Sequence, residues 1–148
     1  PMPIEIVERN AIKVLIRGRR PVLGHGGGGI PVVRNEEGGL EGVAAVIDKD
    51  RASGLLASEI GADLFVISTA VEKAYINFGK TNQKALDRIT VAEAREYIKQ
   101  EQFAKGSMLP KIQSIVGFLE AGGKEAIITN PESIESALKG EAGTHIVP

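Results

Sequence analysis

A lysine between two carboxylates, and a run of glycines, are the first residues of this chain that could do chemistry. The run Gly26-Gly27-Gly28-Gly29 follows the short apolar stretch 21–23. Four glycines let a ligand approach the backbone closely and can turn several N–H groups toward an anion. Lys49 is flanked by Asp48 and Asp50, which hold its ammonium in place and keep it protonated. A fixed ammonium beside an N–H-rich loop suits a phosphoryl group in transfer.

A second lysine occupies a comparable place. Lys111 follows Gly106-Ser107-Met108 and begins a predicted helix, where the helix dipole disfavours a cation. A bound polyphosphate would compensate for that position. Three simpler interpretations stay open: a solvated surface lysine at position 111, an Asp50 that only caps a helix, and a glycine run that serves only the backbone of a turn.

A third stretch suggests a place for a nucleotide base. Tyr75-Ile76-Asn77-Phe78 combines apolar faces with backbone polar groups, as an adenine slot would. The same residues equally fit a short strand or extended loop that belongs to the core and its edge.

Two well-known nucleotide motifs are excluded by context. Gly24-x-Gly26-x-x-Gly29 matches the dinucleotide fingerprint, with Asp48 near the right distance beyond it. That fingerprint requires a helix to start at the glycines, whereas Ile30-Pro31-Val32-Val33 disfavours one. The sequence also lacks the Gly-x4-Gly-Lys-Ser/Thr run of a P-loop.

Composition narrows the class of protein further. The 148 residues suit one domain, and a net charge of -1 argues against broad nucleic-acid binding. Without cysteine there are no disulfides or thiolate metal sites. The only histidines, His25 and His145, lie far apart and lack a ligand set, so we expect no metal site. No apolar run reaches the roughly 20 residues of a membrane span, and no signal peptide opens the chain, so we expect a cytoplasmic protein.

Predicted strands and helices alternate, which favours a mostly parallel α/β sheet covered by helices, within one domain spanning 1–148. The predicted strands are 21–23, 43–47, 64–68, 125–128 and 144–147. Helices are predicted from Pro3 to Gly18, from about Ala52 to Gly61, from a Thr90 capping box, after Lys111, and from Asn130-Pro131 to Lys139. A hairpin tip is predicted at 35–39.

Taken together, these pieces resemble carbamate kinase, a member of the amino-acid kinase superfamily. Five stretches, spread along the chain, carry the resemblance: Gly26-Gly27-Gly28-Gly29-Ile30-Pro31-Val32, Ala45-Val46-Ile47-Asp48-Lys49-Asp50, Tyr75-Ile76-Asn77-Phe78-Gly79-Lys80, Gly106-Ser107-Met108-x-Pro110-Lys111, and Glu120-Ala121-Gly122-Gly123-Lys124 with the ending Gly143-Thr144. The Ile-Asp-Lys-Asp and Gly-Ser-Met-x-Pro-Lys pieces are highly specific in combination.

The resemblance implies an amino-acid kinase fold and reversible phosphoryl transfer between carbamoyl phosphate and ADP, giving ATP and carbamate, with Mg²⁺. It implies that Lys49 and Lys111 contact the phosphates, that Asp50 orients both lysines, and that the loop 26–29, with Asp48, faces the transferring group. It places the base and ribose at Thr69, Ala70, Val71, Tyr75, Asn77, Phe78 and Met108. A homodimer and a role in arginine metabolism are further implications.

Two departures from the family accompany the resemblance. Leu109 stands where the family commonly has glycine, so its β-carbon restricts the backbone before Lys111. The family's chain is also roughly twice this long, and its first half carries the carbamate site and another catalytic lysine. We therefore expect either a piece of a longer protein or a product without its first half, inactive alone. The alternative is a stand-alone nucleotide-binding module that catalyses nothing.

Overall fold

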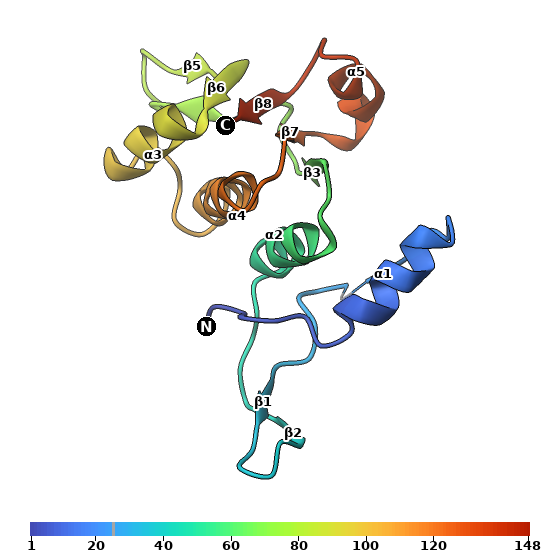
Figure 1. The fold of residues 1–148 in the computed structure, drawn as a ribbon. Coiled ribbons are helices and arrows are strands. Elements are labelled where there is room, and N and C mark those ends of the chain that lie inside the picture. Colours follow the sequence, from blue (N-terminus) through green and yellow to red (C-terminus); the bar gives the residue numbers. More distant parts are fainter. Residues whose placement is uncertain (25) are drawn as a thin grey trace.

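The computed structural model describes residues 1–24 and 26–148, which form a helical and extended N-terminal part followed by an α/β body (Figure 1). The N-terminal part contains α1 (Arg9–Arg17) and the hairpin of β1 (Val32–Arg34) and β2 (Leu40–Gly42). The elements of the body are, in order, α2 (Lys49–Ile60), β3 (Leu64–Ser68), β4 (Tyr75–Ile76), β5 (Lys84–Ala85), β6 (Arg88–Thr90), α3 (Val91–Lys99), α4 (Met108–Glu120), β7 (Glu125–Thr129), a 3-10 turn (Pro131–Ser133), α5 (Ile134–Leu138) and β8 (Thr144–Val147).

The body is built on a four-stranded sheet in the order β3-β7-β8-β6. β3 runs parallel to β7 and β6 runs parallel to β8, while β7 and β8 are antiparallel. The sheet is therefore mostly parallel, as the alternation of strands and helices predicted. Among the described residues, β3 forms one edge of this sheet and pairs with β7 alone.

Helix α4 supplies most of the apolar face that covers the sheet. Ile112, Ile115 and Phe118 on this helix are almost fully buried, and the Phe118 ring meets Phe65 of β3 edge to face at 5.5 Å. Helix α2 packs beside α4, with Gly54 so close to the backbone of Ser114 that a β-carbon would lie 3.0 Å from its carbonyl oxygen. In Figure 1, α2 and α4 lie below the sheet and α5 lies above it.

The capping chemistry was predicted for some helix ends but not for the start of α2. There the cap is Asp48 and not Asp50, because the Asp48 side chain accepts from the backbone N–H groups of Asp50 and Arg51, each at 3.0 Å. Gly61 ends that helix in the left-handed conformation, with φ of 70°. Thr90 and Glu93 form the reciprocal capping box of α3. The 64–68, 125–128 and 144–147 strands and the 35–39 hairpin tip are confirmed as well.

Three predictions for the N-terminal part are wrong. Residues 21–23 and 43–47 form no strand, and Leu23 and Val46 are exposed at 104% and 84%. A strand needs a neighbour to receive its hydrogen bonds, and no strand of the described residues pairs with either run along its length. The pairing of β1 with β2 extends only as far as Val43, whose N–H donates to the Pro31 carbonyl at 3.1 Å. The first helix begins at Arg9 rather than Pro3, and it buries no residue fully. The short strands β5 and β6 were not predicted.

The helices of the described residues are all too short or too polar to cross a membrane.

Candidate phosphate-binding site

A single carboxylate joins the two lysines that the sequence singled out. Asp50 is 7% exposed, and its Oδ2 accepts a hydrogen bond from Lys111 Nζ at 2.7 Å. Lys49 Nζ lies 3.3 and 3.4 Å from the two oxygens of the same carboxylate. Lys111 is buried, whereas more than half of the Lys49 side chain is exposed. The cluster is therefore anchored inside the protein and presents one ammonium outward.

The fold brings these residues together through the starts of two helices. Lys49 is the first residue of α2, and Lys111 lies in the first turn of α4. Each helix leads by its C-terminus into one of the parallel strands β3 and β7. Both helix N-termini therefore lie toward the carboxyl ends of these strands, where α/β proteins bind ligands.

The electrostatics of this place favour an anion. Two ammonium groups surround one Asp50 carboxylate, and the positive ends of the α2 and α4 dipoles add to them. Burial lowers the pKa of Lys49, but attraction and hydrogen bonding to Asp50 outweigh it and leave that pKa above its ordinary value. Lys49 is therefore fully charged at neutral pH. The structure assigns its direct partner as Asp50, while Asp48 serves as the cap of α2.

The glycine loop lies directly against this helix start. Gly28 has φ of 127°, and a β-carbon there would lie 2.1 Å from the carbonyl oxygen of Ile47 and 3.6 Å from the backbone nitrogen of Lys49. Gly26 and Gly29 also have positive φ, at 39° and 84°. Only glycine permits this approach. The neighbouring His25 lies outside the described residues.

The residues expected to hold a base and ribose form a second group. Thr69 extends the pairing of β3 by donating from its backbone to the Thr129 carbonyl at 2.8 Å. The rings of Tyr75 and Phe78 are 6.1 Å apart, and Phe78 is 68% exposed. Met108 is the first residue of α4, so it shares the first turn of that helix with Lys111. Ala70 is exposed and Val71 half-buried.

Two glutamines that the sequence did not single out shape this second group. Asn77 has an unusual positive φ of 53°, and its backbone N–H donates to Gln102 Oε1 at 2.8 Å. Gly79 donates in the same way to Gln83 Oε1 at 2.8 Å. No local pattern marks Gln102, because it lies 25 residues from the backbone group that it binds. Gln83 lies only four residues from Gly79, so its contact is local.

Leu109 proves compatible with its place. It is the second residue of α4 and packs half-buried against the hydrophobic core. Helical backbone suits leucine well, so its β-carbon causes no strain before Lys111. The restriction expected at this departure from the family is therefore absent in the structure.

The side chains at this site do not form a ligand set for Mg²⁺. Both oxygens of Asp50 face lysine ammoniums, and Asp48 Oδ1 is used in capping. Mg²⁺ binds protein carboxylates together with substrate phosphates and waters. Over residues 1–24 and 26–148, no group of three or more acidic, histidine or cysteine side chains is arranged to hold a metal ion.

Comparison with known proteins gives the family. The sequence profile described as "Amino acid kinase family" matches residues 2–130. The chain belongs to the amino acid kinase family. Its mostly parallel sheet with covering helices is this family's fold, and the predicted resemblance is confirmed.

Curated members of the amino acid kinase family match along the whole chain. The carbamate kinase-like protein YahI of Escherichia coli is 55% identical over 99% of this chain and 46% of its own. The carbamate kinase of Thermoplasma volcanium is 53% identical over 100% of this chain and 48% of its own. The chain therefore spans about half the length of the curated relatives that it matches.

A solved member of the family superposes closely. Carbamate kinase from Giardia lamblia bound to AMP-PNP has a TM-score of 0.96 and 41% identity, and the match covers 99% of this chain and 46% of that one. The backbone of this chain therefore follows the same course as about half of that protein.

Proposed function

We propose that residues 1–148 form the ADP/ATP-binding domain of a carbamate kinase-type phosphotransferase. The overall reaction is reversible: carbamoyl phosphate and ADP give carbamate and ATP. The observation that carries the proposal is the Asp50 carboxylate bound to both Lys49 and Lys111 beside Gly28. The names of the relatives, and the nucleotide analogue bound to the Giardia enzyme, support the same assignment.

In the proposed reaction, a terminal oxygen of the ADP β-phosphate attacks the phosphorus of carbamoyl phosphate. The bond from phosphorus to the carbamoyl oxygen breaks, and carbamate leaves with the electron pair. Lys49 and Lys111 then neutralise charge on the transferring group, and Asp50 fixes both ammoniums so that little reorganisation is needed. The N–H groups of Gly26 to Gly29 face the same group from the loop.

The nucleotide's base and ribose are proposed to bind at the second group of residues. Tyr75 and Phe78 offer apolar faces, and the backbone held around Asn77 by Gln102 offers polar contacts. Thr69, Ala70, Val71 and Met108 complete the proposed site. Met108 and Lys111 lie in the same helical turn, so a nucleotide that reaches both would extend along the start of α4.

Further properties follow from the family assignment as proposals. Mg²⁺ would neutralise charge on the nucleotide phosphates, and no step above is assigned to it. The proposed enzyme acts in arginine metabolism in the cytoplasm, and its complete form is a homodimer.

The test is ATP formation from carbamoyl phosphate and ADP, measured together with ADP binding. We expect the chain alone to bind ADP but to turn over weakly or not at all, because positioning both reactants supplies much of phosphoryl-transfer catalysis. The same chain should gain turnover when it is joined to the unmatched part of the Thermoplasma relative. If the joined protein binds ADP but shows no turnover, the alternative is favoured, a stand-alone nucleotide-binding module. Robust turnover by the purified chain alone would contradict the proposal that this chain only binds the nucleotide and needs the unmatched part for turnover.

A further inference from the structure

Three of the residues proposed to bind the nucleotide base lie on a small hairpin outside the main sheet. β4 and β5 form a two-stranded antiparallel sheet of their own, and each strand has two residues. Tyr75 belongs to β4, and Asn77 and Phe78 follow directly after it. An isolated two-stranded hairpin is marginally stable at best in water. Contacts with other parts of the chain must therefore fix its position.

A side chain of the main sheet completes this hairpin at the end away from its turn. The pairing of Tyr75 with Ala85 makes Ala74 and Leu86 the next facing pair. Such a pair in an antiparallel sheet exchanges two N–H···O bonds, and one of them is present, from the Leu86 N–H to the Ala74 carbonyl at 2.9 Å. The other is routed through Thr144 of β8. Its hydroxyl accepts from the Ala74 N–H at 2.8 Å and donates to the Leu86 carbonyl.

Burial makes this hydroxyl hard to replace. Thr144 and Ala74 are fully buried, and Leu86 is 4% exposed. Without the hydroxyl, the Ala74 N–H and the Leu86 carbonyl would be left in the interior without these hydrogen bonds, which is costly. The hydroxyl acts as donor and acceptor at once, which a serine could also do but a valine could not.

β8 also holds the other strand of the hairpin, through its backbone. The N–H of His145, the residue after Thr144, donates to the Asp87 carbonyl at 2.8 Å. β6 then continues from there in parallel pairing with β8. The Thr144 hydroxyl is therefore the contact through which β8 reaches Ala74, on the strand that leads into residues 75–78.

We propose that Thr144 is a positioning residue for nucleotide binding, whose hydroxyl holds β4 so that residues 75–78 face the base. This inference rests on the proposed function and adds a residue that is too deeply buried to touch a nucleotide. Thr144 acts through Ala74. The cluster around Asp50 belongs to α2 and α4, so loss of the hydroxyl should loosen the hairpin and leave the phosphate site unchanged.

The test compares ADP with tripolyphosphate, which carries phosphates but neither base nor ribose. Thr144→Val keeps the shape of the side chain and removes the hydroxyl. By calorimetry it should weaken ADP binding at least about tenfold and leave tripolyphosphate binding unchanged. Thr144→Ser should restore ADP binding. A residue that only stabilised the whole fold would lower both affinities together.

Thr129→Val is the matched control. Thr129 is also fully buried and lies on β7, the strand next to β8. Its hydroxyl, however, has no hydrogen-bond partner within the part of the chain that the structure describes. The same substitution there should therefore leave the affinities for ADP and tripolyphosphate unchanged.

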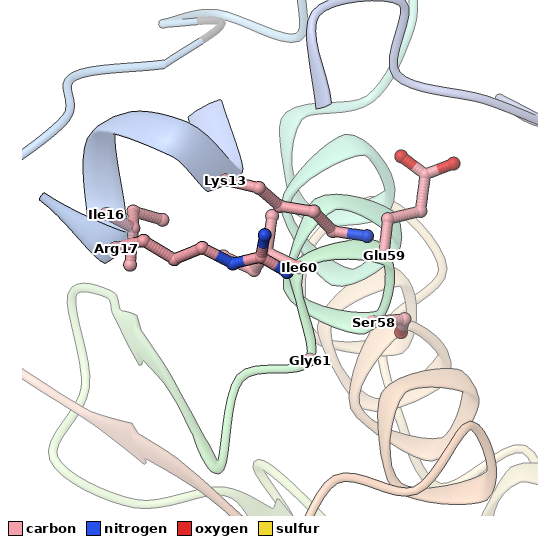
Figure 2. Close-up of a pocket in the computed structure, with 7 residues that line it drawn as sticks. All are labelled: Lys13, Ile16, Arg17, Ser58, Glu59, Ile60 and Gly61. Atoms are coloured by element: carbon pink, nitrogen blue, oxygen red, sulfur yellow. The ribbon is translucent and has the colours of Figure 1, made fainter. Parts of the chain in front are cut away.

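Tripolyphosphate needs a control of its own, because basic side chains elsewhere also attract an anion. Figure 2 shows Lys13 and Arg17 of α1 reaching over a pocket of about 250 Å³ at the end of α2. The residues that line this pocket include none from the hairpin or from β8. Lys13→Ala should leave tripolyphosphate binding unchanged, whereas Lys49→Ala should lower it.

Amide exchange of the unliganded chain is a second measurement, which depends on no nucleotide. In the wild type, the Ala74 amide should exchange as slowly as the amides of β7, whereas Gly79, which is exposed, should exchange quickly. Thr144→Val should speed exchange at Ala74 at least about tenfold and leave β7 protected. The wild-type comparison stands even if Thr144→Val does not fold.

The role of Thr144 is overturned if Thr144→Val binds ADP normally, or if it weakens ADP and tripolyphosphate equally. It is also overturned if Ala74 exchanges as fast as Gly79 in the wild type. A wild-type chain that binds no ADP would instead overturn the proposed function, and the positioning role with it.

Discussion

At the scale of single residues, Asp50 determines where both lysines point. It is the carboxylate that each ammonium contacts, and it is almost fully buried between the starts of two helices. Lys111 shares this burial, whereas Lys49 reaches solvent. The two lysines should therefore respond differently to substitution, because only one of them leaves a buried charge behind.

Removing Lys111 should destabilise the fold as well as the site. Lys111→Ala leaves Asp50 buried without its 2.7 Å partner, and breaking such a pair costs about 3–5 kcal/mol in free energy of unfolding. Lys124→Ala is the control, because the Lys124–Asp63 pair is largely exposed and such pairs contribute about 0–1 kcal/mol. Chemical denaturation of both variants measures this, and equal midpoints would contradict the buried pair. In the complete enzyme, Lys111→Ala should also slow turnover by about 100- to 1000-fold.

ADP binding should require glycine at position 28, whereas position 27 should tolerate alanine, which keeps the backbone N–H. Gly28→Ala places a β-carbon 2.1 Å from the Ile47 carbonyl at a φ of 127°, which must push the loop away from Lys49. A β-carbon at Gly27 would instead have no neighbouring atom within 4 Å. Calorimetry should show at least about a tenfold loss of ADP affinity for Gly28→Ala. Comparable affinities for Gly28→Ala and Gly27→Ala would show that the loop does not face the phosphates.

At the scale of elements, the crossing of α2 and α4 sets the distance between the two lysines. The helices meet at Gly54, where the backbone of Ser114 leaves no room for a side chain. Ser114 and Ser58 each donate to a carbonyl four residues earlier, of Pro110 and Gly54. The contact is therefore made of small residues whose hydroxyl groups are satisfied within their own helices. The two helices can then pack closely.

Gly54→Ala should destabilise the protein, although alanine is the better helix former. Its β-carbon would lie 3.0 Å from the Ser114 carbonyl oxygen, and such overpacking costs about 1–3 kcal/mol. Gly117→Ala, in an open position of α4, should instead stabilise by up to about 1 kcal/mol. Thermal unfolding of the pair checks the opposite signs. Two stabilised variants would mean that the helices are not in close contact.

The start of α3 should lose stability in acid. Hydrogen bonds from the backbone and hydroxyl of Thr90 lower the pKa of Glu93 below its ordinary 4.5. A carboxyl whose pKa falls on folding stabilises the protein above its ordinary pKa, and that stability is lost as the pH falls through the folded value. Urea midpoints of the wild type and Glu93→Gln should therefore converge as the medium is acidified below 4.5. A constant difference across that range would contradict this assignment.

Local chemistry made the α/β body predictable from sequence. Asp48 caps the start of α2, Gly61 ends that helix, and the Thr90–Glu93 pair caps the start of α3. Each of these contacts lies within four residues along the chain. The runs 64–68 and 144–147 became strands because partners for them lie within this chain. The contact between Lys111 and Asp50 spans 61 residues, so its existence followed from the family resemblance rather than from spacing.

At the scale of the whole molecule, the two strand predictions that were wrong share one cause. Residues 21–23 and 43–47 have the composition of buried strands, yet burial depends on what surrounds a segment. Within the described residues no strand pairs with them along their length, and Leu23 and Val46 stay in solvent. The same condition leaves α1 with an open apolar face. The sequence pattern shows that these two segments favour a strand, but the described residues contain no strand that pairs with them along their length.

The proposed phosphate-binding site lies between these two parts of the molecule. Gly28 comes from the N-terminal part, Lys49 and Lys111 come from the α/β body, and Gly28 lies against Ile47, just before the body begins. If the chain binds a nucleotide there, the glycine loop must keep its position against Ile47 and Lys49 without contacts from another protein. This is the central claim about the 148-residue protein, and it does not depend on catalysis.

An amide NMR titration of the chain with ADP tests that claim most directly. We expect saturable shifts at Gly26 to Gly29, Lys49, Asp50 and Lys111 together with 75–78, and we expect Lys49→Ala to weaken them while Lys124→Ala does not. Lys49 is the informative variant, because its side chain is largely exposed and its loss should leave the fold intact. Shifts scattered over α5 and the hairpin of β1 and β2, or shifts unchanged by Lys49→Ala, would contradict the account.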